Sequence, residues 1–207
     1  FNNKEYLLEW KGGMPRIYTY ILPRLEGDDN HFEALVYGCL SPSMKMVEMY
    51  YTENGLPITA DAYWNYGNRY KLGSESAQSY EGVVPLNTDV IRLHLRREPR
   101  FYASIAGDRM YWQRGLNTQN RDNNLLVQAH KGEIPWGTQK DVIVSNDYQN
   151  ISGYWLKKWI YSWIPTKMYY QGITNETMAV LRLSEVYLMQ AEAWNEYLES
   201  PDEEHVY

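Results

Sequence analysis

Cysteine and histidine are scarce in this chain of 207 residues. Its one cysteine, Cys39, rules out an internal disulfide, and no thiol motif surrounds it. The four histidines, His31, His94, His130 and His205, include no pair at the i, i+4 spacing by which a helix binds zinc. The sequence has no phosphate-binding glycine loop and no Gly-x-Ser-x-Gly elbow. We therefore expect no metal site, no cofactor and no catalytic residue.

The chain also lacks a surplus of positive charge and a long apolar run. Its net charge of −6 and its isoelectric point of about 5.3 disfavour a nucleic-acid partner. No apolar run approaches the roughly 20 residues that a membrane-spanning helix needs, and there is no signal peptide. The chain starts and stops like the middle of a protein. We therefore expect a fragment that is incomplete at both ends, so the missing targeting signals say little about location.

Aromatic residues with a polar group are abundant instead. The chain has 20 Tyr and 8 Trp but only 3 Phe. Tyr and Trp combine an apolar ring with a hydrogen-bonding group, which suits surfaces that bind polar ligands. The alternative, which we expect for most of these residues, is that they fill the core and find hydrogen-bond partners there.

The longest helical pattern lies near the end of the chain, over residues 177–198. Apolar residues recur there at steps of three and four: Val180, Leu183, Tyr187, Ala191, Trp194 and Leu198. This spacing predicts one helix, and further apolar residues beside the stripe predict that it is buried between other elements. We expect Glu185 and Glu192, on its flank, to be solvated or paired with arginine.

Four earlier segments are also readable. Residues 5–10 predict a strand. Residues 41–51 predict a short helix with Ser41 as its cap and Pro42 at its first position, followed by a turn at Asn54-Gly55. Residues 88–97 predict a helix capped by Thr88, and residues 98–105 an extended segment, because Pro99 biases the residue before it away from the helix.

Four motifs of the sequence, in the order in which they occur, resemble those of the SusD/RagB family. The family patterns are P-S-x-x-L-V with a later D-G-x-P-I turn, D-P-R-F-Y-A-T-I, G-Y-x-x-K-K, and R-x-A-E-V-x-L-x-x-A-E-A. They fall on residues 42–58, 98–105, 153–158 and 182–193. The departures are conservative: Asn54 and Glu98 replace aspartate, Ser104 replaces threonine, and Ser184 replaces alanine. Trp112 is also similar to the family and is expected to be structural.

The resemblance implies a mainly α fold with long irregular loops and a few short strands. Tetratricopeptide-like helices would carry a loop-rich C-terminal region, and residues 1–207 would be most of that region. It further implies a surface-exposed outer-membrane lipoprotein of Bacteroidetes-type bacteria that captures oligosaccharides, or peptides in some members. The partner would be a SusC-like TonB-dependent transporter. Contact with the membrane would be only through a lipid anchor absent from this fragment.

Residues 60–82 predict a long loop, rich in aromatic and amide side chains and without periodicity. Long loops in compact domains are usually functional or disordered, and so many rings argue against disorder. Flat rings cover the C–H face of a pyranose while neighbouring amides take its hydroxyls, so we predict ligand contacts at Trp64, then Tyr66 and Tyr63, with Asn65 as a hydrogen-bonding neighbour. Trp136 is a lesser candidate. The alternative is that the loop packs on the domain and Trp64 anchors it.

Three functions follow from these patterns. The first is non-enzymatic glycan capture, with peptide capture by the same fold as its variant. The second is glycoside hydrolysis, which needs two carboxyl groups roughly 5 to 10 Å apart across a sugar. The third is a protein-interaction scaffold of helical repeats without a small ligand. The motifs favour the first.

Overall fold

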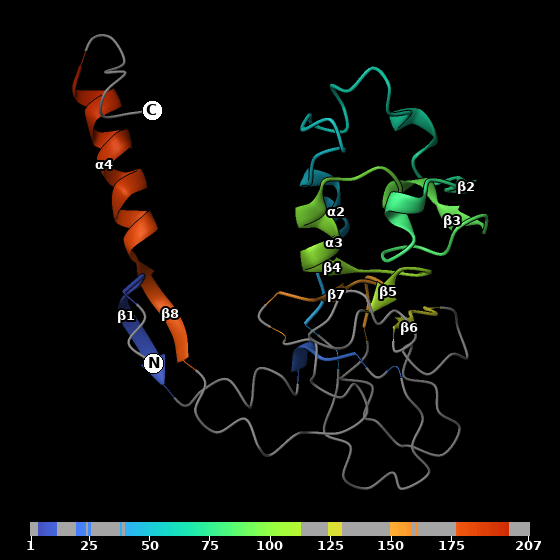
Figure 1. Ribbon diagram of the computed structural model, residues 1–207, viewed down its shortest axis with the longest axis horizontal. Helices are drawn as coiled ribbons and strands as arrows, with labels where there is room; N and C mark the ends of the chain where they lie inside the picture. The colour runs from blue at the N-terminus through green and yellow to red at the C-terminus, as the bar shows by residue number, and fades with distance from the viewer. Residues whose placement is uncertain are drawn as a thin grey trace, which may run out of the picture. The chain divides into compact units, whose positions relative to one another are not determined.

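Figure 1 shows the computed structural model of the chain, which describes residues 4–11, 20–23, 25, 38, 40–112, 124–129, 150–158, 160 and 177–198. The chain divides into two compact units. The first unit takes residues 1–16 and 171–207, and the second takes residues 17–170. The first unit therefore joins the two ends of the chain.

The first unit is built on a two-stranded antiparallel sheet. Strand β1 (Tyr6–Lys11) pairs with β8 (Thr177–Arg182), with Glu9 opposite Ala179. The predicted strand at residues 5–10 is thus confirmed. The prediction that residues 177–182 open a helix is wrong. Their helical spacing is real, but pairing with a distant strand gives their backbone another set of hydrogen-bond partners, and tertiary context overrides local propensity.

Helix α4 (Leu183–Tyr197) starts directly where β8 ends. The amide of Leu183 donates to the backbone carbonyl of Glu5 at 2.8 Å, and the amide of Ser184 donates to the Glu5 carboxylate at 3.2 Å. The first amides of a helix have no partner within it, so Glu5 caps α4 from the opposite end of the chain. The hydrogen bonds with Ser184 lower the pKa of Glu5.

The apolar side chains of α4 are less buried than predicted. Within the described residues no side chain of this helix is fully buried, and Tyr187, Leu188 and Met189 are exposed. The expectations for the acidic flank are confirmed: Arg182 pairs with Glu185 at 3.2 Å, and Glu192 is exposed. Among the described residues, no helix combines the length and the apolar character needed to cross a bilayer.

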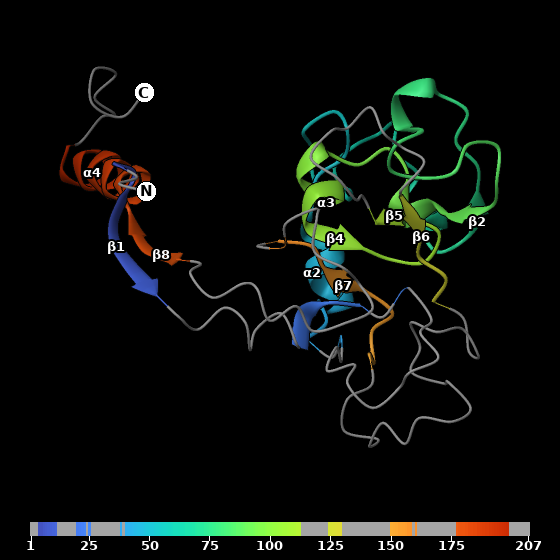
Figure 2. The same ribbon diagram turned by 60° about the horizontal axis from the view of Figure 1, so that its bottom comes forward.

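The second unit consists of short elements joined by irregular segments. Its described residues include the helices α2 (Met44–Met49) and α3 (Pro99–Ser104), with 3₁₀ turns at Tyr66–Asn68, Gln78–Tyr80 and Arg92–His94. Its strands form three antiparallel pairs: β2 (Leu72–Gly73) with β3 (Val90–Ile91), β4 (Ile105–Ala106) with β7 (Trp155–Leu156), and β5 (Tyr111–Trp112) with β6 (Leu125–Leu126). Figure 2 shows α3 leading directly into β4, beside β7.

A hydrophobic core joins these elements. Fully buried side chains come from α2, β3, the Arg92–His94 turn, α3 and β4: Val47, Val90, Leu93, Phe101 and Ile105. Trp112, which we expected to be structural, is 2% exposed. The buried apolar surface of these separate short segments is what holds them in one unit.

A buried arginine completes this core. The side chain of Arg97 donates to four backbone carbonyls, those of Val47, Tyr50, Tyr51 and Leu93, at 2.6 to 3.2 Å. Three of these carbonyls lie in or just after α2, where a helix leaves carbonyls unpaired. Arg97 therefore pairs the carbonyls at the end of α2 and links this end to the segment that precedes α3.

The turn at Asn54-Gly55 is confirmed, but the helix before it is shorter than predicted. Gly55 has φ of +71°, a conformation that glycine adopts without strain, and its amide donates to the Thr52 carbonyl at 3.0 Å. Helix α2 begins at Met44 rather than near Ser41. The cap is Ser43, whose hydroxyl accepts from the Met46 amide at 3.2 Å.

The predictions for residues 88–105 are largely wrong. Residues 88–97 are not a helix: β3 pairs with β2, a 3₁₀ turn follows, and Arg96 has φ of +55°, which no helix tolerates. Glu98 is extended, as expected for the residue before Pro99, but Pro99 then opens helix α3. Proline suits the first helical position because the amide it lacks has no partner there.

Candidate ligand-binding site

A buried carboxylate sets the start of the aromatic loop. Asp61 is 4% exposed and accepts hydrogen bonds from the Thr52 hydroxyl at 2.6 Å, the Asn54 amide group at 3.0 Å and the Tyr63 backbone amide at 2.9 Å. These hydrogen bonds, that of Thr52 first, lower the pKa of Asp61. The loop is thereby fixed to the Asn54-Gly55 turn, and the residues that follow Asp61 are held in one conformation.

Trp64 is the anchor of the loop. Its indole Nε1 donates to the backbone carbonyl of Leu95 at 3.1 Å, and its ring is half-buried against the core. The guanidinium of Arg97 lies 5.6 Å from the centre of that ring. Trp64 therefore anchors the loop to the domain, as the alternative interpretation of this loop expects. The part of the ring that stays accessible still lines a cavity.

Tyr63 and Asn65, on either side of Trp64, lie at the surface. The Tyr63 side chain is 95% exposed. The Asn65 side chain is also exposed, and its oxygen caps the 3₁₀ turn Tyr66–Asn68 by accepting from the Asn68 amide at 3.2 Å. The fixed turn presents the Asn65 amide group beside an exposed ring.

Tyr66 belongs to a different cluster. The guanidinium of Arg69 lies 4.0 Å from the centre of the Tyr66 ring and 4.2 Å from that of Tyr70, so it sits against both. The Nε of Arg69 also donates to the Glu48 carboxylate at 2.6 Å. Tyr66 therefore packs in a cation–π cluster and is not among the side chains that line the cavity beside Trp64.

A cavity of about 250 Å³ opens beside the loop, and we call it the Trp64 cavity. Three of the predicted ligand residues line it: Tyr63, Trp64 and Asn65. The other lining residues are Ser74, Glu75, Ser76, Arg92, Leu95 and Arg96. The structure thus brings aromatic rings together with hydroxyl and charged groups from more distant segments.

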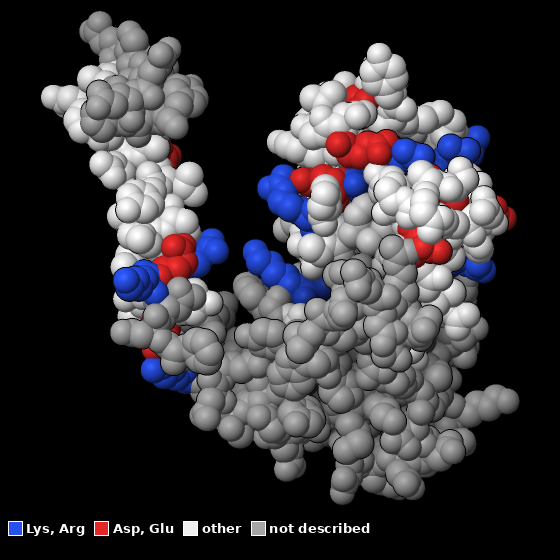
Figure 3. Space-filling view, in the orientation of Figure 1, with Lys and Arg blue, Asp and Glu red and all other residues white. Residues whose placement is uncertain are grey.

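The charged groups in the wall of this cavity are partly paired. Glu75 is buried and accepts from the Arg96 Nε at 2.6 Å and from the backbone amides of Ser76 and Ala77 at 2.9 and 2.8 Å. Arg96 also reaches the Glu53 carboxylate at 3.4 Å. Arg96 thus forms ion pairs with two carboxylates, those of Glu75 and Glu53. In Figure 3 acidic and basic side chains accordingly lie in adjacent patches on this unit.

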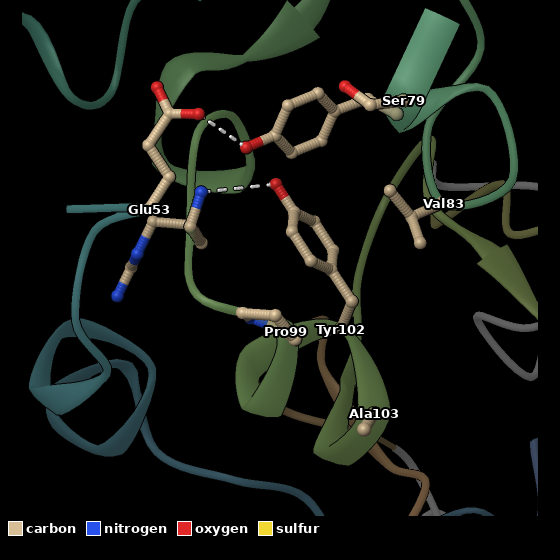
Figure 4. Close-up of a pocket in the computed structure, with 8 residues that line it drawn as sticks. Glu53, Ser79, Val83, Pro99, Tyr102 and Ala103 are labelled. Atoms are coloured by element: carbon tan, nitrogen blue, oxygen red, sulfur yellow. Dashed lines mark hydrogen bonds between the residues drawn. The ribbon is translucent and has the colours of Figure 1, made fainter. Parts of the chain in front are cut away.

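A second cavity, of about 510 Å³, is lined by Glu53, Ser79, Tyr80, Val83, Arg97, Pro99, Tyr102 and Ala103 (Figure 4). Its phenol groups have protein partners. The Tyr80 hydroxyl donates to Glu53 at 2.7 Å, while the Tyr102 hydroxyl donates to the His94 carbonyl at 2.8 Å and accepts from the Arg97 amide at 3.2 Å. The two phenol hydroxyls are therefore already hydrogen-bonded within the protein.

Sequence reasoning missed the charged residues of the cavity. Glu75 lies within the predicted loop but carries no motif, while Arg92 and Arg96 lie outside the loop and follow β3, the strand that pairs with β2. The remaining predicted residue, Trp136, lies outside the described residues. Within the described part of the chain, no group of three or more His, Cys, Asp and Glu side chains is arranged to hold a metal ion.

The fold is that of a SusD-like protein. The chain superposes on the selenomethionine form of BT4246 with a TM-score of 0.66 and 22% identity, covering 94% of this chain and 31% of that one. It superposes on a SusD-like protein, BF3747 from Bacteroides fragilis NCTC 9343, with a TM-score of 0.50 and 21% identity, covering 95% and 33%. The chain thus spans about a third of the length of these proteins. No curated protein matches it.

The sequence profile of the SusD family matches residues 12–204, and the chain belongs to this family. The resemblance carried by the four motifs is confirmed. Members of the family are generally non-catalytic, glycan-binding proteins of nutrient uptake, typically associated with the outer membrane and working with SusC-like transporters.

Proposed function

We propose that this chain captures a glycan at the Trp64 cavity without cleaving it, as part of a surface protein that delivers the glycan to a SusC-like TonB-dependent transporter. The observation that carries the proposal is the composition of the cavity. Its lining combines two aromatic residues, Tyr63 and Trp64, with Asn65 and two serines, Ser74 and Ser76. Such a wall matches the two faces of a sugar, apolar C–H and polar hydroxyl.

We further propose that residues 1–207 form most of the C-terminal region of a longer, mainly α, lipid-anchored protein. The coverage of about a third of the BT4246 and BF3747 chains supports this. The exposed apolar residues of α4, among them Leu188 at 70% and Tyr187 at 62%, also support it, because a helix with such a surface normally packs against other helices. A gene for a SusC-like transporter beside the gene for this chain would add support.

Titration calorimetry of the full-length protein with a panel of oligosaccharides tests capture. Tyr63→Ala is the informative variant, because its exposed side chain has little to contribute to the fold. We expect it to weaken binding about tenfold, in line with the loss of one aromatic stacking contact. Tyr197→Ala is the matched control, since Tyr197 is 81% exposed on α4, and we expect it to bind like the unaltered protein. Equal binding by all three proteins would place the ligand elsewhere.

The hydrolase alternative rests on the two carboxylates around Arg96. The Glu75 carboxylate accepts from the Arg96 guanidinium and from the backbone amides of Ser76 and Ala77, so protein donors already occupy its oxygens. We therefore expect mass spectrometry to recover the bound oligosaccharide unchanged. New reducing ends that disappear in the Glu53→Gln or Glu75→Gln variant would establish hydrolysis instead. Binding of peptides but no oligosaccharide would favour the peptide variant of capture.

A further inference from the structure

Arg92 lines the Trp64 cavity from a fixed position. It follows β3 directly and opens the 3₁₀ turn Arg92–His94. Its backbone amide donates to the Lys71 carbonyl at 2.9 Å, and its side-chain Nε donates to the Leu72 carbonyl at 3.2 Å. Both contacts tie the residue to the strand pair β2–β3. The Arg92 side chain is therefore hydrogen-bonded to β2 although the residue is exposed.

Gly73 makes room for this orientation. A Cβ atom at position 73 would lie 2.9 Å from Cγ, 3.1 Å from Nε and 3.2 Å from Cζ of Arg92, all closer than ordinary van der Waals contact. The φ angle of Gly73 is not in the left-handed region, so a Cβ atom at this position would displace the Arg92 side chain rather than strain the backbone. The Arg92 side chain therefore lies flat across the backbone of β2. This placement lowers the entropy that a ligand must overcome to order the side chain.

The charge of Arg92 is not matched by a carboxylate in the described part of the chain. The other arginine that lines the cavity has such partners: Arg96 contacts Glu75 and Glu53. Only the Nε of Arg92 is used, so its two terminal nitrogens have no protein partner among the described residues. Both acidic groups near the cavity are directed to Arg96, and neither neutralises Arg92.

We propose that Arg92 binds an anionic substituent of the captured glycan, a carboxylate or a sulfate ester. The proposal rests on the proposed function and adds the chemical class of its ligand. The two terminal nitrogens of a guanidinium donate parallel hydrogen bonds to two oxygens of a carboxylate or a sulfate ester, so Arg92 binds the substituent while the rings of Tyr63 and Trp64 cover the sugar. The chain has an acidic net charge, so long-range electrostatic attraction does not favour an anionic ligand. A preference for an anionic glycan therefore has to come from a local contact, which Arg92 would supply.

Binding of matched glycan pairs tests the proposal. The acidic probes are oligogalacturonates, which carry only carboxylates, and chondroitin sulfate oligosaccharides, which carry both groups. Carboxyl reduction makes the oligogalacturonates neutral, whereas chondroitin sulfate loses only its carboxylates on carboxyl reduction, only its sulfates on desulfation, and all its charge after both. We expect the full-length protein to bind at least one acidic form about tenfold or more tightly than its counterpart, and the preference to shrink as salt rises. The pair that shows the preference identifies the group.

Variants separate recognition of charge from capture itself. We expect Arg92→Gln to bring the acidic and neutral forms within about twofold of each other while neutral binding persists, and Gly73→Ala to reduce the preference by displacing the same guanidinium. Arg182→Gln, which removes an exposed arginine of the other unit, should keep it. Equal binding of both forms by the unaltered protein, or equal loss of both in Arg92→Gln, overturns the role of Arg92 alone. Failure of every glycan to bind overturns capture and this role together.

Discussion

The indole nitrogen of Trp64 donates to the backbone carbonyl of Leu95, 31 residues further along the chain, at 3.1 Å. This hydrogen bond fixes the aromatic loop to the segment that carries Arg92 and Arg96. The two walls of the Trp64 cavity, which come from different parts of the chain, are thereby held at one spacing.

Trp64→Phe keeps a ring and removes the donor. We expect the free energy of unfolding to fall by about 1 kcal/mol, the usual net value of one hydrogen bond, and the affinity for glycan to fall as well because the loop moves. Chemical denaturation and calorimetry measure the two effects. A variant as stable as the original and binding equally well would show that the hydrogen bond positions nothing.

Arg97→Lys tests the buried guanidinium. Lysine keeps the charge but cannot reach four carbonyls at once, so several of them lose their donor in the core. We expect thermal unfolding to show a loss of about 3 kcal/mol. Arg100→Lys is the control, because the Arg100 side chain is 73% exposed, and we expect a change below about 0.5 kcal/mol. Similar effects of both substitutions would contradict the role of Arg97.

His94 makes stability depend on pH. Its ring is 1% exposed, its Nε2 lies 2.9 Å from the Tyr154 hydroxyl, and its Nδ1 has no hydrogen-bond partner within the described residues. Burial lowers the pKa of His94 from 6.5 to about 4. Between these two values the unfolded chain binds a proton that the folded chain does not, so stability falls as pH falls from 6.5 to about 4.

The loss from this one group is about 3 kcal/mol over that window. The measurement is the free energy of unfolding at pH 7 and at pH 4.5 for the protein and for His94→Gln. The variant should be less stable at neutral pH but lose less on acidification. Identical losses would mean that other groups carry the pH dependence.

Gly107 lies against the same pair of rings. A Cβ atom there would lie 2.7 Å from Cε1 of Tyr154 and 3.1 Å from Cε1 of His94, and neither ring has room to move in the core. We expect Gly107→Ala to lower the free energy of unfolding by about 2 kcal/mol in thermal denaturation. Gly67→Ala, whose nearest neighbour would be the Asn65 side-chain oxygen at 3.8 Å, should be neutral or slightly stabilising. Equal effects would show that Gly107 has space.

Some features that depend on neighbouring residues were predicted correctly, although the cap of α2 was not. The turn at Asn54-Gly55 follows from the preference of glycine for positive φ, and the family follows from short motifs at the right spacing. Tyr63, Trp64 and Asn65 are adjacent in sequence, so their joint presence at one cavity follows from a single loop.

Features that depend on distant pairing were not predictable from one sequence. Residues 177–182 have helical spacing, but they form a strand because Tyr6–Lys11 lie beside them. Arg92 reaches the cavity only because β3 pairs with β2. Tyr66 packs instead against Arg69, which pairs with Glu48, and does not line the cavity. Such contacts are set by packing among segments far apart in the chain, which periodicity does not report.

The position and the chemical state of a bound oligosaccharide test the central claim most directly. A crystal structure of the full-length protein soaked with an oligosaccharide that binds in calorimetry should show a sugar ring in van der Waals contact with Tyr63 and Trp64, with every glycosidic bond intact. A ligand bound only in the cavity of Tyr80 and Tyr102, or a cleaved one beside Glu53 and Glu75, would contradict the account.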